Sequence, residues 1–147
     1  MTARDRFTAT YRAVIELNNI KALIASDGDD WKPPGVHAPG VSDPTASRAI
    51  RNVDYWGVKL EELRKRETEL EDFIGVTLAI IEAVRAGLGH DYADLLDQRY
   101  IDGFAWRDVT LRGEVVPRST GKRKIAIAFD WIDSVGVSHL LRGEYEV

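Results

Sequence analysis

Residues 95–132 read LLDQRYIDGFAWRDVTLRGEVVPRSTGKRKIAIAFDWI, and this stretch decides the predicted fold. Gly103 and Gly113 interrupt it, and Pro117 precedes its last segment. Glycine often ends a helix and proline is tolerated at a helix start. The pattern therefore predicts a helix that ends near residue 102, a short helix over 104–111, a turn, and a last helix over 117–133. Helices joined by a compact turn are typical of a helix-turn-helix.

The last predicted helix carries the candidate site, because hydroxyls and cations cluster in its first two turns. They are Arg118, Ser119, Thr120, Lys122, Arg123 and Lys124. In a helix that enters a DNA major groove, such side chains reach base edges and phosphates. Cations at a helix N-terminus oppose the helix dipole, which makes an ordinary solvated face the less favoured interpretation. We expect these six residues to bind DNA, with Ile125, Ala128 and Trp106 holding the helix in place.

Two longer helices are predicted upstream. The first covers residues 4–26, with an apolar stripe of Phe7, Tyr11, Val14, Leu17, Ile20 and Ile24. The second runs from a cap at Asp43 and Pro44 to about Ala86, and alternate spacings of three and four along it define a seam. The seam comprises Val53, Trp56, Leu60, Leu63, Glu67, Leu70, Ile74, Thr77, Ile81 and Val84.

The first helix is about half as long as the second, so it covers only part of the seam. We expect the stalk residues Trp56, Leu60, Leu63, Leu70, Ile74 and Ile81 to pair with the first helix and with a second subunit. The segment 27–43 is rich in Gly and Pro and is predicted to be a mobile loop. The predicted fold is all-α, with a long antiparallel, coiled-coil-like helical hairpin over 1–87 and a helix-turn-helix domain over 88–147.

Composition narrows the classes of function. The 147 residues carry a net charge of about −4, so DNA binding would depend on a local basic patch rather than on bulk charge. The absence of Cys excludes disulfides and cysteine metal sites and fits a cytoplasmic protein. The N-terminus does not read as a signal peptide, and no apolar run is long enough to span a membrane.

Catalytic and metal chemistry find no support in the sequence. His37, His90 and His139 are far apart and lack metal-ligand spacing. STGKRK lacks the upstream glycine and strand of a phosphate-binding loop. Acidic residues on the long helix alternate with basic ones, as on a solvated face. We therefore expect no enzyme activity, no cofactor and no metal.

Part of the C-terminal sequence resembles phage regulators of the ArpU/RinA type and region four of sigma factors. The resemblance lies in RYIDGFAW, a following DV, a short turn, and PRST with Ala128 downstream. The match covers about forty residues. It implies a DNA-binding transcriptional regulator of a phage or prophage, often of late genes, working in a bacterial host, with RNA polymerase as a further candidate partner. The sequence departs from the family pattern at Ala105, Thr110 and Gly121, and its turn is about one residue longer.

Two other functions stay open. A small terminase-like packaging subunit would also use a helix-turn-helix and helical hairpins, but it would assemble as a ring. A helical adaptor would keep the fold without the DNA. Residues 88–147 hold eight Lys or Arg against ten Asp or Glu, which favours the adaptor. Mass in solution and DNA binding distinguish the three functions.

Overall fold

The computed structural model describes residues 1–26 and 45–145, with side chains described outside 45–54. Most of these residues are helical, which confirms the all-α class. The elements are α1 (Ala3–Ala25), α2 (Thr45–Gly87), α3 (His90–Leu96), a π-helical turn (Asp97–Ile101), a 3-10 turn (Trp106–Asp108), β1 (Thr110–Leu111), β2 (Glu114–Val115), α4 (Arg118–Val135) and α5 (Val137–Leu141). The loop predicted over 27–43 and the seam residue Val53 lie outside the described residues and side chains.

The contacts divide the chain into two compact units. Unit 1 comprises Met1–Val14 and Asp72–Val147, and unit 2 comprises Ile15–Glu71. Helices α1 and α2 each contribute one part to either unit. That residues 88–147 form a domain of their own stays a prediction.

In unit 2, side chains of α1 and α2 contact one another. Arg66 Nη2 lies 2.8 Å from Glu16 Oε2, and Lys21 Nζ lies 3.4 Å from Glu71 Oε1. Among the described side chains of this unit, the buried apolar residues are Leu17, Ile20, Leu63 and Leu70. These four residues belong to the predicted stripe and seam, which leave out the buried Ala13, Ile80 and Ala83 of the same helices. Trp56 and Leu60, also predicted in the seam, are half-buried.

The core of unit 1 forms where α3 and α4 pack against the start of α1 and the end of α2. Its fully buried side chains include Phe7, Ile80, Ile81, Leu95, Leu96 and Ile132. The rings of Phe7, Tyr100 and Phe129 pack against one another with centroids 5.4–5.8 Å apart. Because these rings come from three separate segments, they join α1 to the C-terminal half of the chain.

The first predicted stripe is wrong at Tyr11, and its residues Val14 and Ile24 are only half-buried. Tyr11 is 41% exposed, and Thr10 takes the buried position instead. The hydroxyls of Thr10 and Thr77 lie 2.7 Å apart, and Arg6 Nε donates to Thr77 Oγ1 at 3.1 Å. A buried hydroxyl needs a hydrogen-bond partner, and α2 supplies one at Thr77.

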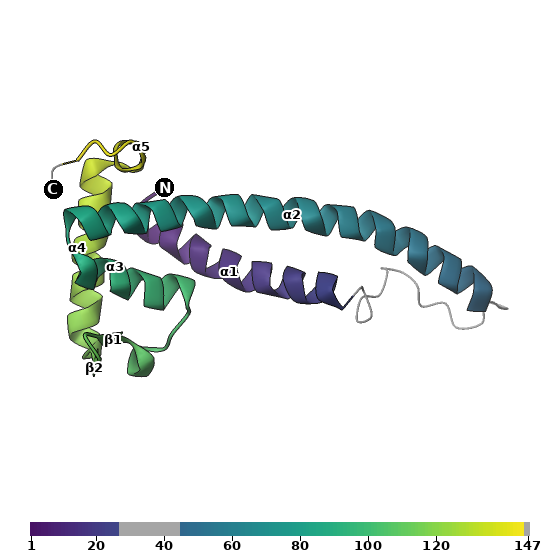
Figure 1. Cartoon of the computed structure of the whole chain (residues 1–147), viewed down its shortest axis with the longest axis horizontal. Coiled ribbons are helices and arrows are strands. Elements are labelled where there is room, and N and C mark those ends of the chain that lie inside the picture. Colours follow the sequence, from purple (N-terminus) through teal and green to yellow (C-terminus); the bar gives the residue numbers. More distant parts are fainter. Residues whose placement is uncertain (27–44, 146–147) are drawn as a thin grey trace. The chain divides into compact units, whose positions relative to one another are not determined.

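The short helix predicted over 104–111 is also wrong. Only Trp106–Asp108 forms a single turn, after which the chain enters a β-hairpin pairing Thr110 with Val115 and Leu111 with Glu114. Arg112 and Gly113 both have positive φ, 56° and 83°, as a two-residue hairpin turn requires. Figure 1 shows this hairpin at the N-terminal end of α4.

The physical reason is β-branched sequence on both sides of an Arg-Gly turn. Val109 and Val116 flank the strands and are both buried, and the Val116 amide donates to the Val109 carbonyl at 3.0 Å. β-Branched residues favour extended backbone, and the turn lets both valines reach the core. The other predicted ends agree with the structure: Gly103 has φ 72°, and α4 follows Pro117 directly.

Candidate nucleic-acid interface

The first turn of α4 presents free backbone amides. Pro117 is the N-cap residue, with φ −56°, and no side chain caps this helix end. The first intrahelical bond runs from the Gly121 amide to the Pro117 carbonyl at 2.9 Å. The amides of Arg118, Ser119 and Thr120 form no hydrogen bond with any described residue. Free amides at a helix N-terminus bind anions such as phosphate.

The six predicted DNA-binding residues divide into two groups. Arg118, Ser119, Lys122 and Arg123 are exposed, and their spacing places Ser119, Lys122 and Arg123 on the side of α4 away from the core. We call these four residues the basic face; Arg118, seven positions before the buried Ile125, belongs to it by its exposure at the helix start. Ile125 and Ala128 are buried on the opposite side, as the sequence predicts.

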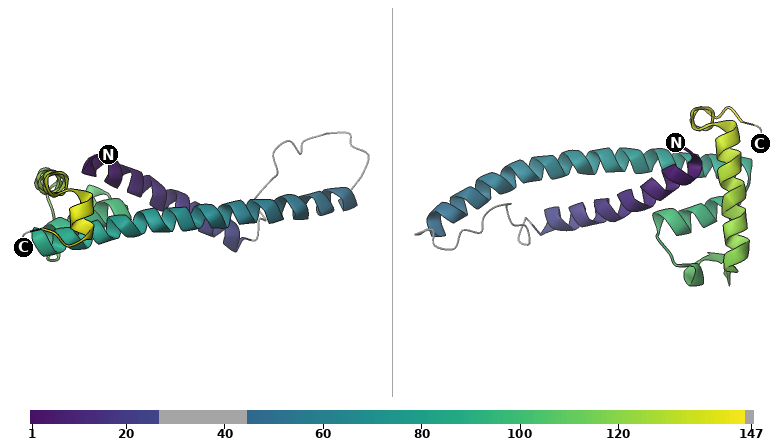
Figure 2. Two further views of the ribbon diagram at one scale, coloured as in Figure 1. Left: turned by 90° about the horizontal axis from the view of Figure 1, so that it is seen from above. Right: turned by 180° about the vertical axis from the view of Figure 1, so that it is seen from behind.

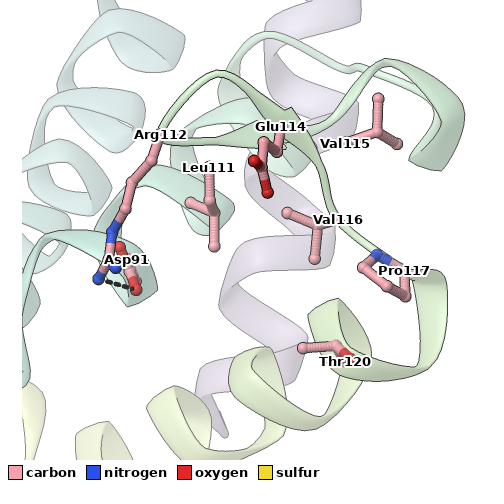
Figure 3. A pocket seen from close by; sticks show the side chains of 8 residues that line it. All are labelled: Asp91, Leu111, Arg112, Glu114, Val115, Val116, Pro117 and Thr120. Carbon is pink, nitrogen blue, oxygen red and sulfur yellow. Dashed lines mark hydrogen bonds and ion pairs between the residues drawn. The ribbon is translucent and has the colours of Figure 1, made fainter.

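Thr120 and Lys124 are half-buried beside the basic face. The Lys124 ammonium lies 5.0 Å from the centre of the Tyr92 ring, a cation–π contact with α3. Thr120 lines an open hollow of about 350 Å³ (Figure 3). Its other lining residues are Asp91, Leu111, Arg112, Glu114, Val115, Val116 and Pro117. The contacts of Lys124 leave it less free than its neighbours to reach a ligand.

The cations of the basic face are unpaired, whereas the acidic residues of α3 and its π-helical turn are paired. Across the described residues, Arg118, Lys122 and Arg123 take part in no ion pair. The acidic residues of α3 and its π-helical turn form ion pairs with two other arginines. Arg85 contacts Asp94 at 2.6 Å and Asp97 at 3.1 Å. Arg112 contacts Asp91 at 3.0 Å (Figure 3). The positive charge of α4 is therefore not neutralised by the acidic residues of α3.

Burial and ion pairing shift the pKa values of Asp97 and Arg85. Burial raises the pKa of Asp97 above its usual range, and the nearby Arg85 only partly offsets that rise. The pKa of Arg85 is raised, first of all by its hydrogen bond with Asp94. The geometry agrees, since the Asp94 contact is the shorter one. We therefore regard Asp94 as the principal partner of Arg85.

Trp106 and Gly121 fit together at the first turn of α4. A Cβ atom placed on Gly121 would come within 2.1 Å of Trp106 Cζ3. The indole thus packs directly on the helix backbone, which only glycine permits. The Arg99 guanidinium carbon lies 4.7 Å from the Trp106 ring centre. Gly121, which departs from the family pattern, makes room for Trp106.

Three residues with a place at this site were not predicted. Gln98 and Arg99 contact the chain that leads to α4, and the Arg107 side chain is 87% exposed on the 3-10 turn next to Trp106. No local sequence signal identifies Gln98 or Arg99, because their partners lie five to twelve residues away. Arg107 could have been found as the cation next to Trp106.

Other site chemistry has little support in the described part of the chain. Within residues 1–26 and 45–145, His, Asp and Glu side chains nowhere gather into a group that could hold a metal ion. Over the same residues, no helix has both the length and the apolar character needed to cross a membrane. Comparison of the chain with protein-family models, with curated proteins and with solved structures gave no match.

Proposed function

We propose that the chain is a DNA-binding transcriptional regulator whose recognition helix is α4. The observation that carries the proposal is the basic face. Three exposed cations, unpaired among the described residues, lie beside the free amides of one helix N-terminus. Arginine and lysine bind phosphate, and arginine also reads guanine through two parallel hydrogen bonds.

In this proposal, α3 with its π-helical turn takes the place of the first helix of a helix-turn-helix. α3 packs beside α4 (Figure 2), and the hairpin lengthens the connection between them. The amino-acid resemblance to phage ArpU/RinA-type regulators and to sigma region four supports this arrangement. In this proposal the protein is encoded by a phage or prophage, and bacterial RNA polymerase is a further candidate partner.

A second copy of the chain belongs to the proposal. Three phosphate contacts per chain give only weak binding at physiological salt, and the whole chain has a net charge of −4. Pairing through the stalk would double the contacts and fix the spacing of two half-sites. Since Leu63, Leu70, Ile74 and Ile81 are already buried within one chain, the exposed surface of α2 would have to supply this contact.

The test measures DNA binding by gel shift at a series of salt concentrations, with fragments of the parent phage genome as the DNA. The variant Arg118→Ala, Lys122→Ala, Arg123→Ala removes the three cations of the basic face. A matched control removes Arg12, Arg64 and Lys65, which are exposed on α1 and α2. Both variants change net charge equally, so only the position of the charge differs.

We expect the basic-face variant to bind DNA more weakly and its salt slope to fall by about one per cation removed, while the control keeps the affinity and the slope of wild type. Equal losses in the two variants, or no wild-type shift at low salt, would contradict the proposal. The second result would favour an adaptor. A mass in solution of eight to ten copies would instead favour a terminase-like ring.

A further inference from the structure

Gln98 and Arg99, in the π-helical turn after α3, form hydrogen bonds with the chain between α3 and α4. The Gln98 side chain forms two hydrogen bonds with Thr110: its Nε2 donates to the carbonyl at 2.7 Å, and its Oε1 accepts from the amide at 2.9 Å. The neighbouring Arg99 donates from Nη1 to the Phe104 carbonyl at 2.5 Å. The Phe104 amide in turn donates to the Gln98 carbonyl at 2.8 Å. Residues 104–110 are thus tethered to the π-helical turn Asp97–Ile101.

Arg99 also acts on α4 through Trp106. Its guanidinium stacks over the indole, and the same indole contacts Gly121 in the first turn of α4. The ring is therefore held between a cation and a helix backbone. A change in the position of Arg99 would move the ring, and a change in the ring would move the start of α4.

The turn that supplies both side chains is itself unusual. Single π-helical turns within helices often occur at functional sites. Here the turn follows α3 directly, and two consecutive residues, Gln98 and Arg99, both bind the segment that leads to α4. The start of α4 has no side-chain cap, and its Gly121 packs against Trp106 of this segment.

We propose that Gln98 and Arg99 are positioning residues for the basic face, which hold α4 in the orientation that presents Arg118, Lys122 and Arg123 to DNA. The inference rests on the proposed function. Neither residue needs to touch DNA in it. The role of Arg99 lies in its planar guanidinium, which stacks and donates at once, rather than in its charge.

Two substitutions of Arg99 distinguish a positioning role from a role of its charge. Arg99→Lys keeps the charge but removes the planar stack, and Arg99→Met removes both. Gln98→Leu keeps the size of the side chain and removes both hydrogen bonds with Thr110. Arg142→Met, near the C-terminus, is the control for the loss of one exposed cation of unit 1.

Each variant is measured for binding to the duplex DNA used above and for amide hydrogen exchange over residues 104–116. We expect Arg99→Lys, Arg99→Met and Gln98→Leu each to weaken DNA binding by about tenfold, since ordering contacts of this kind are lost. Exchange at the Thr110 and Val116 amides should become faster in all three. Arg142→Met should leave binding within about twofold of wild type, as expected for one exposed ion pair.

The exchange data make the two failures distinguishable. If wild type binds DNA and Arg99→Lys binds equally well, the positioning role is overturned and the proposed function stands. If exchange over 104–116 is unchanged in all three variants, the positioning role is overturned whether or not DNA binds. If wild type does not bind DNA but exchange rises as expected, the proposed function fails, and with it the role assigned to these residues in presenting the face to DNA.

Discussion

Replacing Gly121 by alanine should destabilise the protein, although alanine is the better helix former. Gly121 lies within α4 and is buried. The added Cβ would lie 2.1, 2.7 and 3.1 Å from three carbons of the Trp106 ring. Carbon atoms in contact prefer separations of about 3.5–4.0 Å, so the indole would have to move by more than about 1 Å.

The size of the effect follows from two opposed contributions. Alanine should gain about 1 kcal/mol from helix propensity. Overpacking of this kind costs about 1–3 kcal/mol, and displacement of the indole also weakens its stack with Arg99, by about 0.5–1 kcal/mol. The free energy of unfolding should therefore fall by about 0.5–3 kcal/mol in Gly121→Ala.

Urea denaturation followed by far-UV circular dichroism measures this free energy. Gly75→Ala is the control, because Gly75 is also inside a helix and a Cβ there would meet nothing within 4 Å. That variant should be stabilised by up to about 1 kcal/mol. In a Trp106→Leu background, Gly121→Ala should instead be neutral or stabilising by up to about 1 kcal/mol, which gives a double-mutant coupling of about 0.5–4 kcal/mol. Stabilisation by Gly121→Ala in the wild-type background would refute the reasoning.

Three further predictions concern unit 1. Gly87→Ala should lower the free energy of unfolding by about 1–2 kcal/mol in urea denaturation, because a Cβ there would lie 2.4 Å from Trp131 Cζ2; an unchanged midpoint would contradict it. Thr77→Val should cost about 1–3 kcal/mol in the same assay, because Arg6 Nε loses its acceptor. Burial raises the pKa of Asp97, so its ionisation costs the folded state free energy as pH rises above the unfolded value of about 3.9. Asp97→Asn should therefore gain stability relative to wild type as pH rises above the unfolded value in thermal denaturation, and a difference that stays constant with pH would be the contrary result.

Helix periodicity was sufficient to predict α4 and most of α2. α4 has a proline before it and buried residues at spacings of three and four, and both signals are local. Residues with the same spacing on α2, such as Leu63, Leu70 and Ile74, are buried as expected. Local signals agree there with the tertiary packing, so the sequence alone is informative.

The prediction for the segment 104–116 was wrong because it did not use the β-branched residues beside the Arg-Gly turn, and because part of the segment's conformation depends on distant partners. The sequence pattern predicts that Gly113 ends a helix, whereas in the structure Gly113 forms a hairpin turn with Arg112. The amide and carbonyl of Thr110 bind the Gln98 side chain, which no pattern within the segment reveals. Thr10 is a similar case, since a hydroxyl is acceptable at a buried position only because Thr77 lies opposite it.

The acidic balance of residues 88–147 carries less weight against DNA binding than a count suggests. Asp91, Asp94 and Asp97 are three of its ten acidic residues, and all three bind arginines, one of which, Arg85, lies on α2 outside this range. The exposed cations of α4, in contrast, have no acidic partner among the described residues. The potential that an approaching phosphate meets depends on nearby unpaired charges, since salt screens the rest beyond about 8–10 Å. The charge pattern that bears on the function is therefore the three unpaired cations at the start of α4, and a decrease in salt slope on their removal is its direct measure.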